Sequence, residues 1–214
     1  MKIINKPKIK RESMAVIVVD MQNDFVSKGG KFVENSPGYY QAAQEIIPRI
    51  KVLLEEARAA AVPIIFTATH YQKDYVDAGL LSLSRELDAL VSGTWGAEII
   101  KELLDEARER YYLVEKQRYS AFYGTNLEIL LRGLKAETLV ITGFAANICV
   151  ESTARAARDA DFFPVVVSDC TASFSPELWQ SALTNVERFF GSAMESKEVI
   201  AIMQGKGLGL DIVG

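Results

Sequence analysis

The chain has 214 residues, of which 49% are hydrophobic, and its formal net charge is −4. This charge argues against nucleic acid as a partner, and no apolar run reaches the roughly 20 residues that span a bilayer. No Pro-, Gly- or Ser-rich linker divides the chain, so we predict one domain over residues 1–214. Within it, residues 1–13 are expected to form a solvated basic N-terminal arm and not a secretory signal.

Strand and helix patterns alternate along the first half of the chain. Residues 15–19 are a continuous apolar run, typical of a strand buried on both faces. Residues 39–60 carry an apolar helical stripe, and Pro48 is expected to kink this helix or mark its restart. A second strand is predicted at 62–69. Residues 70–96 lack periodicity, and a loop of this length is usually functional or a lid.

The same alternation continues to the end of the chain. Thr125 followed by Glu128 predicts a capping box at the start of one helix. The predicted helices cover residues 97–108, 125–134, 149–160 and 176–190, the predicted strands cover 111–114, 138–142 and 162–167, and a short strand with a last helix covers 193–203.

This pattern predicts an α/β fold of three αβα layers, Rossmann-like, with about six mostly parallel strands and helices on both faces. In such sheets, ligands bind at the carboxyl ends of the strands. A nucleotide-binding domain or an inert interaction protein is the alternative, but the chain has neither G-x-G-x-x-G nor a P-loop. The predicted strand ends carry Asp20, Thr69, His70, Lys116, the loop 143–149 and Asp169.

Three of these strand-end residues could act together in catalysis. Asp20 offers a carboxylate, Lys116 an ammonium and Cys149 a thiol, which supply a base, an orienting group and a nucleophile. Cys149 opens a predicted helix, where the helix dipole and a nearby lysine would favour a thiolate. Spacing alone does not show that the three side chains meet. A buried small thiol, a turn cap and a solvated lysine are the structural alternatives.

Four segments of the sequence carry motifs in a fixed order. They are VIVVDMQNDF (16–25), GTWGAEI (93–99), EKQRYSAFYGTNL (115–127) and VITGFAANICVESTARAA (140–157). In these segments the chain resembles the isochorismatase-like cysteine hydrolases, which include nicotinamidases, N-carbamoylsarcosine amidases, ureidoacrylate amidohydrolases and biuret hydrolases. The resemblance runs from about Met14 to Met203.

The resemblance implies a catalytic triad of Asp20, Lys116 and Cys149. It also implies a cis peptide between Phe144 and Ala145, with the amides of Ala145 and Cys149 forming an oxyanion hole. The family members are usually homo-oligomers, so a dimer or tetramer is expected, and no cofactor is implied. Two cysteines do not make a disulfide framework, so we expect free thiols in a reducing, cytoplasmic location.

The branch of the family narrows the expected reaction. Segments 147–153 and 185–191 look most like ureidoacrylate and biuret hydrolases, and 93–99 also resembles N-carbamoylsarcosine amidases. Cys149 favours hydrolysis of a C–N bond in a small amide, carbamoyl or ureido compound through a thioester. The alternative is vinyl-ether cleavage of the isochorismatase type, which does not need the thiol. Ala146 stands where many members have Thr, so the exact substrate stays open.

Nicotinamidase activity is another alternative. Nicotinamidases resemble one another in having a metal site, built from one Asp and two His near the second strand. This chain has one histidine, His70, and Ala68 occupies the carboxylate position. We therefore expect no metal and disfavour nicotinamide as substrate. The candidate pocket residues, each of which could instead be structural, are Phe25, His70, Trp95, Arg118, Tyr119 and Asn147.

Overall fold

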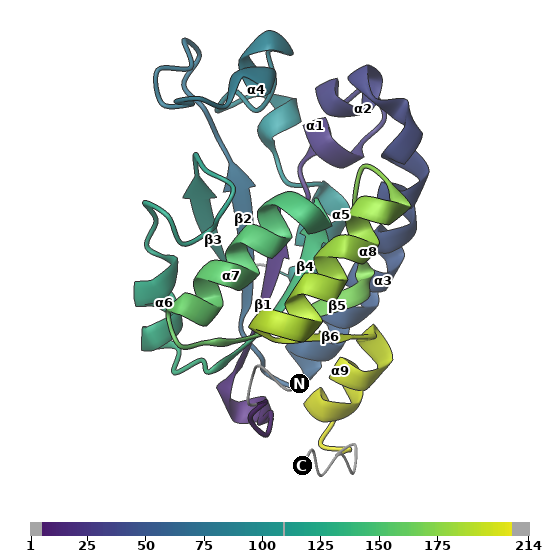
Figure 1. Cartoon of the computed structure of the whole chain (residues 1–214), viewed down its shortest axis with the longest axis vertical. Helices are drawn as coiled ribbons and strands as arrows, with labels where there is room; N and C mark the ends of the chain where they lie inside the picture. The colour runs from purple at the N-terminus through teal and green to yellow at the C-terminus, as the bar shows by residue number, and fades with distance from the viewer. Residues whose placement is uncertain (1–5, 109, 207–214) are drawn as a thin grey trace.

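The computed structural model describes residues 6–108 and 110–206, and within them a single six-stranded sheet organises the chain (Figure 1). The strand order is β3-β2-β1-β4-β5-β6, and every pairing is parallel. This confirms the predicted α/β architecture. The strands are β1 (Met14–Val19), β2 (Ile64–Thr69), β3 (Tyr111–Lys116), β4 (Thr138–Phe144), β5 (Phe163–Ala172) and β6 (Ser192–Met194).

Helices cover both faces of the sheet, which explains the continuous apolar runs of its central strands. In β1, Val16 and Val18 belong to one hydrophobic cluster, whereas Ile17 and Val19 belong to another on the opposite face. One face is covered by α3 (Tyr40–Ala59), α5 (Lys101–Ala107) and α9 (Ser196–Met203), the other by α6 (Leu127–Gly133), α7 (Glu151–Asp159) and α8 (Pro176–Asn185).

Short elements gather beyond the carboxyl ends of the strands (Figure 1). The segment 70–96, predicted as a loop or lid, contains the short helix α4 (Ser82–Glu86) and leads into a 3₁₀ turn at Trp95–Ala97. It lies near α1 (Asn23–Val26) and α2 (Lys31–Asn35), which the sequence patterns did not predict. Within the described part of the chain, no helix is long and apolar enough to cross a membrane.

Two predicted helix starts were wrong because other contacts, one with a distant segment and one local, use the same backbone groups. The helix expected at 97–108 begins only at Lys101, since Ile99 pairs with Gln22 and the Ile100 amide donates to Met21. The capping box expected at Thr125 does not form. Its hydroxyl instead accepts from the Leu127 amide at 3.1 Å, and Asn126 occupies the N-cap.

Other boundaries also differ from the sequence prediction. Helix α3 runs unbroken past Pro48, which lies on its exposed side, so the restart expected there does not occur. The helix expected from Cys149 begins instead with a wide π-helical turn at Ala146–Val150, and α7 follows it. Strand β5 continues beyond its predicted end, so Asp169 lies inside the strand, where it accepts hydrogen bonds from Ser196. Helix α8 likewise gives way to a π-helical turn at Val186–Phe190.

Gly143 allows β4 to lie directly against the end of β1. Its φ is +112°, and a Cβ built there would lie 2.1 Å from the carbonyl oxygen of Val19. We expect Gly143→Ala to lower the free energy of unfolding by about 3–5 kcal/mol, because strained backbone and overpacking add. Chemical denaturation measures this change.

Gly133→Ala is the matched control for that prediction. Gly133 ends α6, and a Cβ there would meet no atom within 4 Å. We expect the control to change stability by less than about 1 kcal/mol, in the stabilising direction, because alanine is the better helix former. Equal effects of the two substitutions would contradict the steric explanation for Gly143.

Candidate active site

The parallel register brings the ends of four strands to one level of the sheet. Val19 pairs with both Thr67 and Gly143, and Thr69 pairs with Lys116. Asp20 follows β1 directly, so its side chain meets groups from β2 and β3 at the sheet edge. The loop after β4 supplies Cys149 from the other side.

Lys116 lies between Asp20 and Cys149 and contacts both of them. The Nζ atom of Lys116 is 2.7 Å from Oδ2 of Asp20 and 3.7 Å from Sγ of Cys149. The side chains of Asp20 and Lys116 are both 0% exposed, and Cys149 is buried as well. The three groups that sequence reasoning singled out therefore form one buried polar cluster.

Two threonines of β2 hold this cluster in place, Thr69, which the sequence analysis placed at a strand end, and Thr67, which it did not single out. The hydroxyl of Thr67 donates to Oδ1 of Asp20 at 2.8 Å. Thr69 accepts from Nζ of Lys116 at 2.8 Å and donates to Oδ2 of Asp20 at 3.3 Å. The available signal was their spacing, since residues two apart in a strand point to the same face. Asp20 itself has a φ of +51°, a conformation that Asp tolerates better than most residues.

Burial and the neighbouring charges determine the protonation of the cluster. Burial disfavours a charged Lys116, but Asp20 and Cys149 outweigh it and raise the pKa of the ammonium above its usual value. Burial also raises the pKa of the Cys149 thiol, Asp20 raises it further, and Lys116 opposes both only in part. These directions favour a neutral thiol beside a charged lysine, whereas the helix dipole and the lysine alone would favour a thiolate.

The pH dependence of alkylation at Cys149 tests this conclusion. A raised pKa means less thiolate at any given pH, so iodoacetamide should label Cys149 slowly at pH 7. The labelling rate should keep rising beyond about pH 8.5, where an ordinary thiol is half ionised. Mass spectrometry of the Cys149 peptide measures this rate separately from buried Cys170. A rate that levels off below neutral pH would show that the cluster stabilises a thiolate instead.

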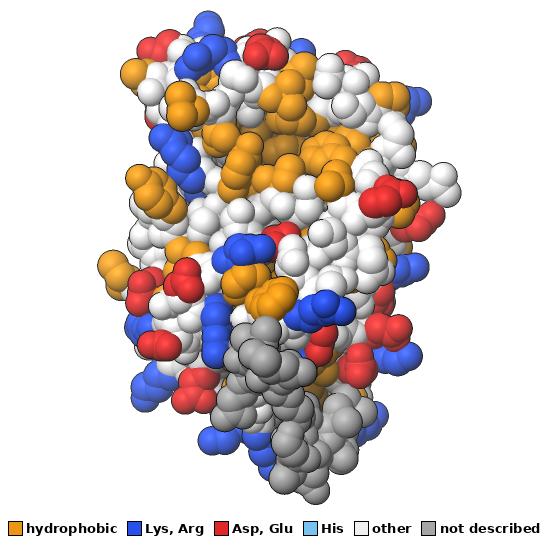
Figure 2. All heavy atoms as spheres, viewed as in Figure 1, with side chains coloured by type: hydrophobic (Ala, Val, Ile, Leu, Met, Phe, Trp, Pro, Cys, Tyr) orange, Lys and Arg blue, Asp and Glu red, His pale blue; other side chains and the backbone are white. Residues whose placement is uncertain are grey.

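A cavity of about 280 Å³ opens beside Cys149, and its walls are mostly apolar. Figure 2 shows a hollow bordered by hydrophobic side chains at the end of the molecule where the short elements gather. Aromatic rings of Phe25, Phe32, Phe144 and Phe174 form part of the wall. A cavity of this size suits a small molecule that reaches the thiol through an apolar enclosure.

Phe144 places the main chain of the nucleophile loop against this cavity. Its ring stacks on Tyr39 with centroids 4.9 Å apart, and its peptide bond to Ala145 is cis, as the resemblance implied. Ala145 and Cys149 both line the cavity. Both residues therefore border the space beside the thiol, and the oxyanion hole formed by their amides stays a prediction.

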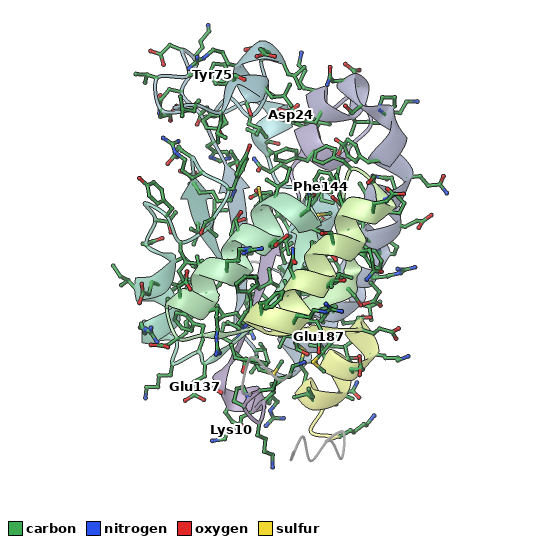
Figure 3. All side chains as sticks on the ribbon, viewed as in Figure 1. Lys10, Asp24, Tyr75, Glu137, Phe144 and Glu187 are labelled. Carbon is green, nitrogen blue, oxygen red and sulfur yellow. The ribbon has the colours of Figure 1, made fainter. Side chains whose placement is uncertain are left out.

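Asp24 fastens the segment 70–96 over the cavity. Its buried carboxylate accepts hydrogen bonds from the amides of Leu90 at 2.7 Å and Lys31 at 3.1 Å. Figure 3 shows Asp24 and Tyr75 at the same end of the molecule as Phe144, whereas Glu137 lies toward the opposite end. Asp24 thus links the covering segment, through Leu90, to the start of α2, and Asn23 of the same motif also donates to the Trp95 carbonyl at 2.8 Å.

The candidate pocket residues divide into two groups. Phe25, Arg118 and Tyr119 line the cavity, whereas His70, Trp95 and Asn147 lie outside its lining. Both ring nitrogens of His70 are within hydrogen-bond distance of a protein oxygen. Nδ1 lies 3.1 Å from the Glu115 carboxylate, and Nε2 lies 3.1 Å from the Ala97 carbonyl. Trp95 is half exposed, and Asn147 accepts a hydrogen bond from Ser173.

Tyr71 is a cavity residue that sequence reasoning missed. It follows β2 by two positions, is 2% exposed and lines the cavity together with Cys149. Burial raises the pKa of its hydroxyl to about 12, so the group stays protonated at neutral pH.

The structure offers no support for a metal centre in its described part, since the residues there hold no group of three or more His, Cys, Asp or Glu that could bind a metal ion. The metal-free site stays a prediction.

Known proteins resemble this chain over most of its length. Residues 14–198 match the isochorismatase domain family. A ureidoacrylate amidohydrolase, RutB, from Agrobacterium fabrum is 37% identical over 200 residues, which cover 86% of each chain. A cysteine hydrolase structure from Pseudomonas syringae pv. phaseolicola superposes with a TM-score of 0.84 at 26% identity, covering 95% of this chain and 100% of that one. An N-carbamoylsarcosine amidase from Thermoplasma acidophilum gives a TM-score of 0.70 at 26% identity, covering 89% and 98%.

Proposed function

The chain belongs to the isochorismatase family, and from this premise we propose that it hydrolyses a C–N bond in a small amide, carbamoyl or ureido compound through Cys149. The observation that carries the proposal is the buried contact of Lys116 with Asp20 and Cys149 beside an apolar cavity. The names of the relatives, a ureidoacrylate amidohydrolase and an N-carbamoylsarcosine amidase, support the same bond type.

The first half of the proposed reaction acylates the enzyme. Asp20 accepts the proton of the Cys149 thiol as sulfur attacks the substrate carbonyl carbon, so the raised thiol pKa is overcome only during attack. The carbonyl oxygen becomes an oxyanion, which the amides of Ala145 and Cys149 stabilise. The C–N bond then breaks, and the leaving nitrogen takes the proton from Asp20. A thioester on Cys149 remains.

The second half of the reaction restores the thiol. Water attacks the thioester carbonyl while Asp20 accepts one of its protons, and the C–S bond breaks. The sulfur recovers a proton from Asp20, and the acid product leaves. Lys116 keeps its charge throughout and holds Asp20 and Cys149 in register, because its Nζ atom contacts both.

An ammonia-release screen tests the proposed function. The panel contains carbamoyl, ureido and nicotinamide compounds, and the control is the same protein after complete alkylation of Cys149. We expect release from ureido or carbamoyl compounds and none from the alkylated control. Release that survives alkylation would contradict the cysteine mechanism. No release from any member of the panel would contradict the proposed bond type.

Compartment and assembly are further parts of the proposal. Cys149 and Cys170 are both free thiols, which suits a reducing compartment such as the cytoplasm. A homo-oligomer is expected from the family. Light scattering after size-exclusion chromatography measures its size, and a monomer at micromolar concentration would contradict it.

A further inference from the structure

Two buried hydroxyls of the covering segment, those of Tyr71 and Ser84, reach the cavity. Tyr71 is 2% exposed and Ser84, in α4, is 7% exposed, and both line the cavity beside Cys149. The amide of Tyr71 donates to the Leu90 carbonyl, and its carbonyl accepts from the Ser92 amide, each at 2.9 Å. Main-chain contacts therefore hold Tyr71 in place without the use of its hydroxyl.

Neither hydroxyl makes a hydrogen bond of normal geometry within the part of the chain that the structure describes. By contrast, the hydroxyl of Tyr75 in the same segment donates to the Ala89 carbonyl at 2.8 Å. The hydroxyls of Tyr71 and Ser84 are not sealed in the interior, because the sealed side-chain atom without a partner there is Nε of Arg58. A buried hydroxyl without a partner lowers stability, and a bound molecule can supply the partner from the cavity.

The hydroxyl of Tyr71 also lies near the groups that react. Burial raises its pKa to about 12, Lys116 lowers this pKa, and Cys149 and Asp20 raise it further. The Ser84 hydroxyl lowers the same pKa, so it lies beside the phenol. Both hydroxyls are therefore neutral at neutral pH, and they border the cavity close to the catalytic cluster.

The departing nitrogen of the proposed reaction needs hydrogen-bond acceptors of its own. An amide or ureido nitrogen carries N–H donors, which are costly to leave unpaired between apolar walls. The Thr69 hydroxyl already accepts from Lys116 and donates to Asp20. Among the buried hydroxyls that line the cavity in the described chain, those of Tyr71 and Ser84 remain unused.

We propose that the hydroxyls of Tyr71 and Ser84, the hydroxyl pair, bind the leaving nitrogen of the substrate by accepting its N–H groups. The inference rests on the proposed function and adds two residues that touch the substrate. The carbonyl oxygen then points to the proposed oxyanion hole in the nucleophile loop. The hydroxyl pair keeps the nitrogen beside the cluster, where its lone pair can take the proton from Asp20. The covering segment thereby becomes part of the site.

Paired ligands test this inference in the Cys149→Ala protein, without turnover. Hexanamide is compared with methyl pentyl ketone, and benzamide with acetophenone, because each ketone replaces the amide nitrogen by a methyl group. Calorimetry measures the ratio of the two dissociation constants. We expect at least one amide to bind about 5- to 30-fold more tightly than its ketone, as a hydrogen bond to a buried partner implies. Adding Tyr71→Phe should remove most of this preference, and adding Ser84→Ala should remove part of it.

Tyr75→Phe is the matched control, because the Tyr75 hydroxyl is used within the protein and does not line the cavity. It should lower the melting temperature and leave the amide preference unchanged. Tyr71→Phe should keep or raise the melting temperature, because the hydroxyl that it removes has no partner in the free protein. A loss of stability equal to that of Tyr75→Phe, or an unchanged amide preference in Tyr71→Phe, would overturn the inference. Two ligand pairs in which neither amide binds better than its ketone would overturn it without any Tyr71 variant.

Kinetics separate this inference from the proposed function. For a compound that the unmodified protein hydrolyses, Tyr71→Phe should lower kcat/KM by about 10- to 100-fold. An unchanged kcat/KM would contradict the role of the hydroxyl pair and leave the function standing. An amide preference that depends on Tyr71, without ammonia release from any compound of the screen, would support the hydroxyl pair and contradict the function.

Discussion

Replacing Cys149 by Ala is expected to lower kcat by at least about 10³-fold, because the nucleophile is the one group that bonds to the substrate. Cys149→Ser should be nearly as inactive, since Asp20 would have to accept a proton from a much weaker acid. The fold should survive both changes, because Ala and Ser are close in size to the buried Cys149 side chain that they replace. Steady-state kinetics and circular dichroism measure the two effects.

Cys170→Ala is the matched control for the nucleophile. Cys170 is 0% exposed and belongs to the hydrophobic cluster on the other face of the sheet. Its loss should reduce stability but leave kcat within a few-fold of the unmodified protein. Equal activity in Cys149→Ala and Cys170→Ala would contradict the mechanism at its central step.

Lys116→Met is expected to remove activity and also to lower the free energy of unfolding by about 3–5 kcal/mol. Methionine keeps much of the side-chain length but leaves the carboxylate of Asp20 buried without its cation, 0% exposed. The double variant Asp20→Asn with Lys116→Met removes both charges. It should recover much of the stability and none of the activity, as measured by urea denaturation and ammonia release.

Lys101→Met provides the comparison at the surface. Lys101 pairs with Asp105 at 3.3 Å, but its side chain is 88% exposed, so water already solvates both charges. We expect little change in stability. A double variant at Asp20 and Lys116 that is no more stable than Lys116→Met alone would contradict the argument that an unpaired buried charge causes the loss.

The helix boundaries are the features of the fold that the sequence patterns predicted wrongly. Thr125 and Glu128 satisfy the local rule for a capping box, yet the Thr125 hydroxyl also donates to the Ala121 carbonyl at 2.5 Å. Residues 98–100 carry a helical pattern, yet the chain there pairs with the segment after β1. At Thr125 a competing local turn takes up the hydroxyl, whereas at residues 98–100 a tertiary contact satisfies backbone groups that a local rule assigns to a helix.

The sequence by itself determined the order of strands and helices, the burial of β1 on both faces and the family motifs that contain Asp20, Lys116 and Cys149. These features depend on residues that are close together in the chain. Only the tertiary structure decided the register of Val19 with Gly143 and of Thr69 with Lys116. It also decided that burial raises the pKa of the Cys149 thiol and that Arg118 lines the cavity. Burial and charge pairing depend on atoms from distant segments, which the fold alone brings together.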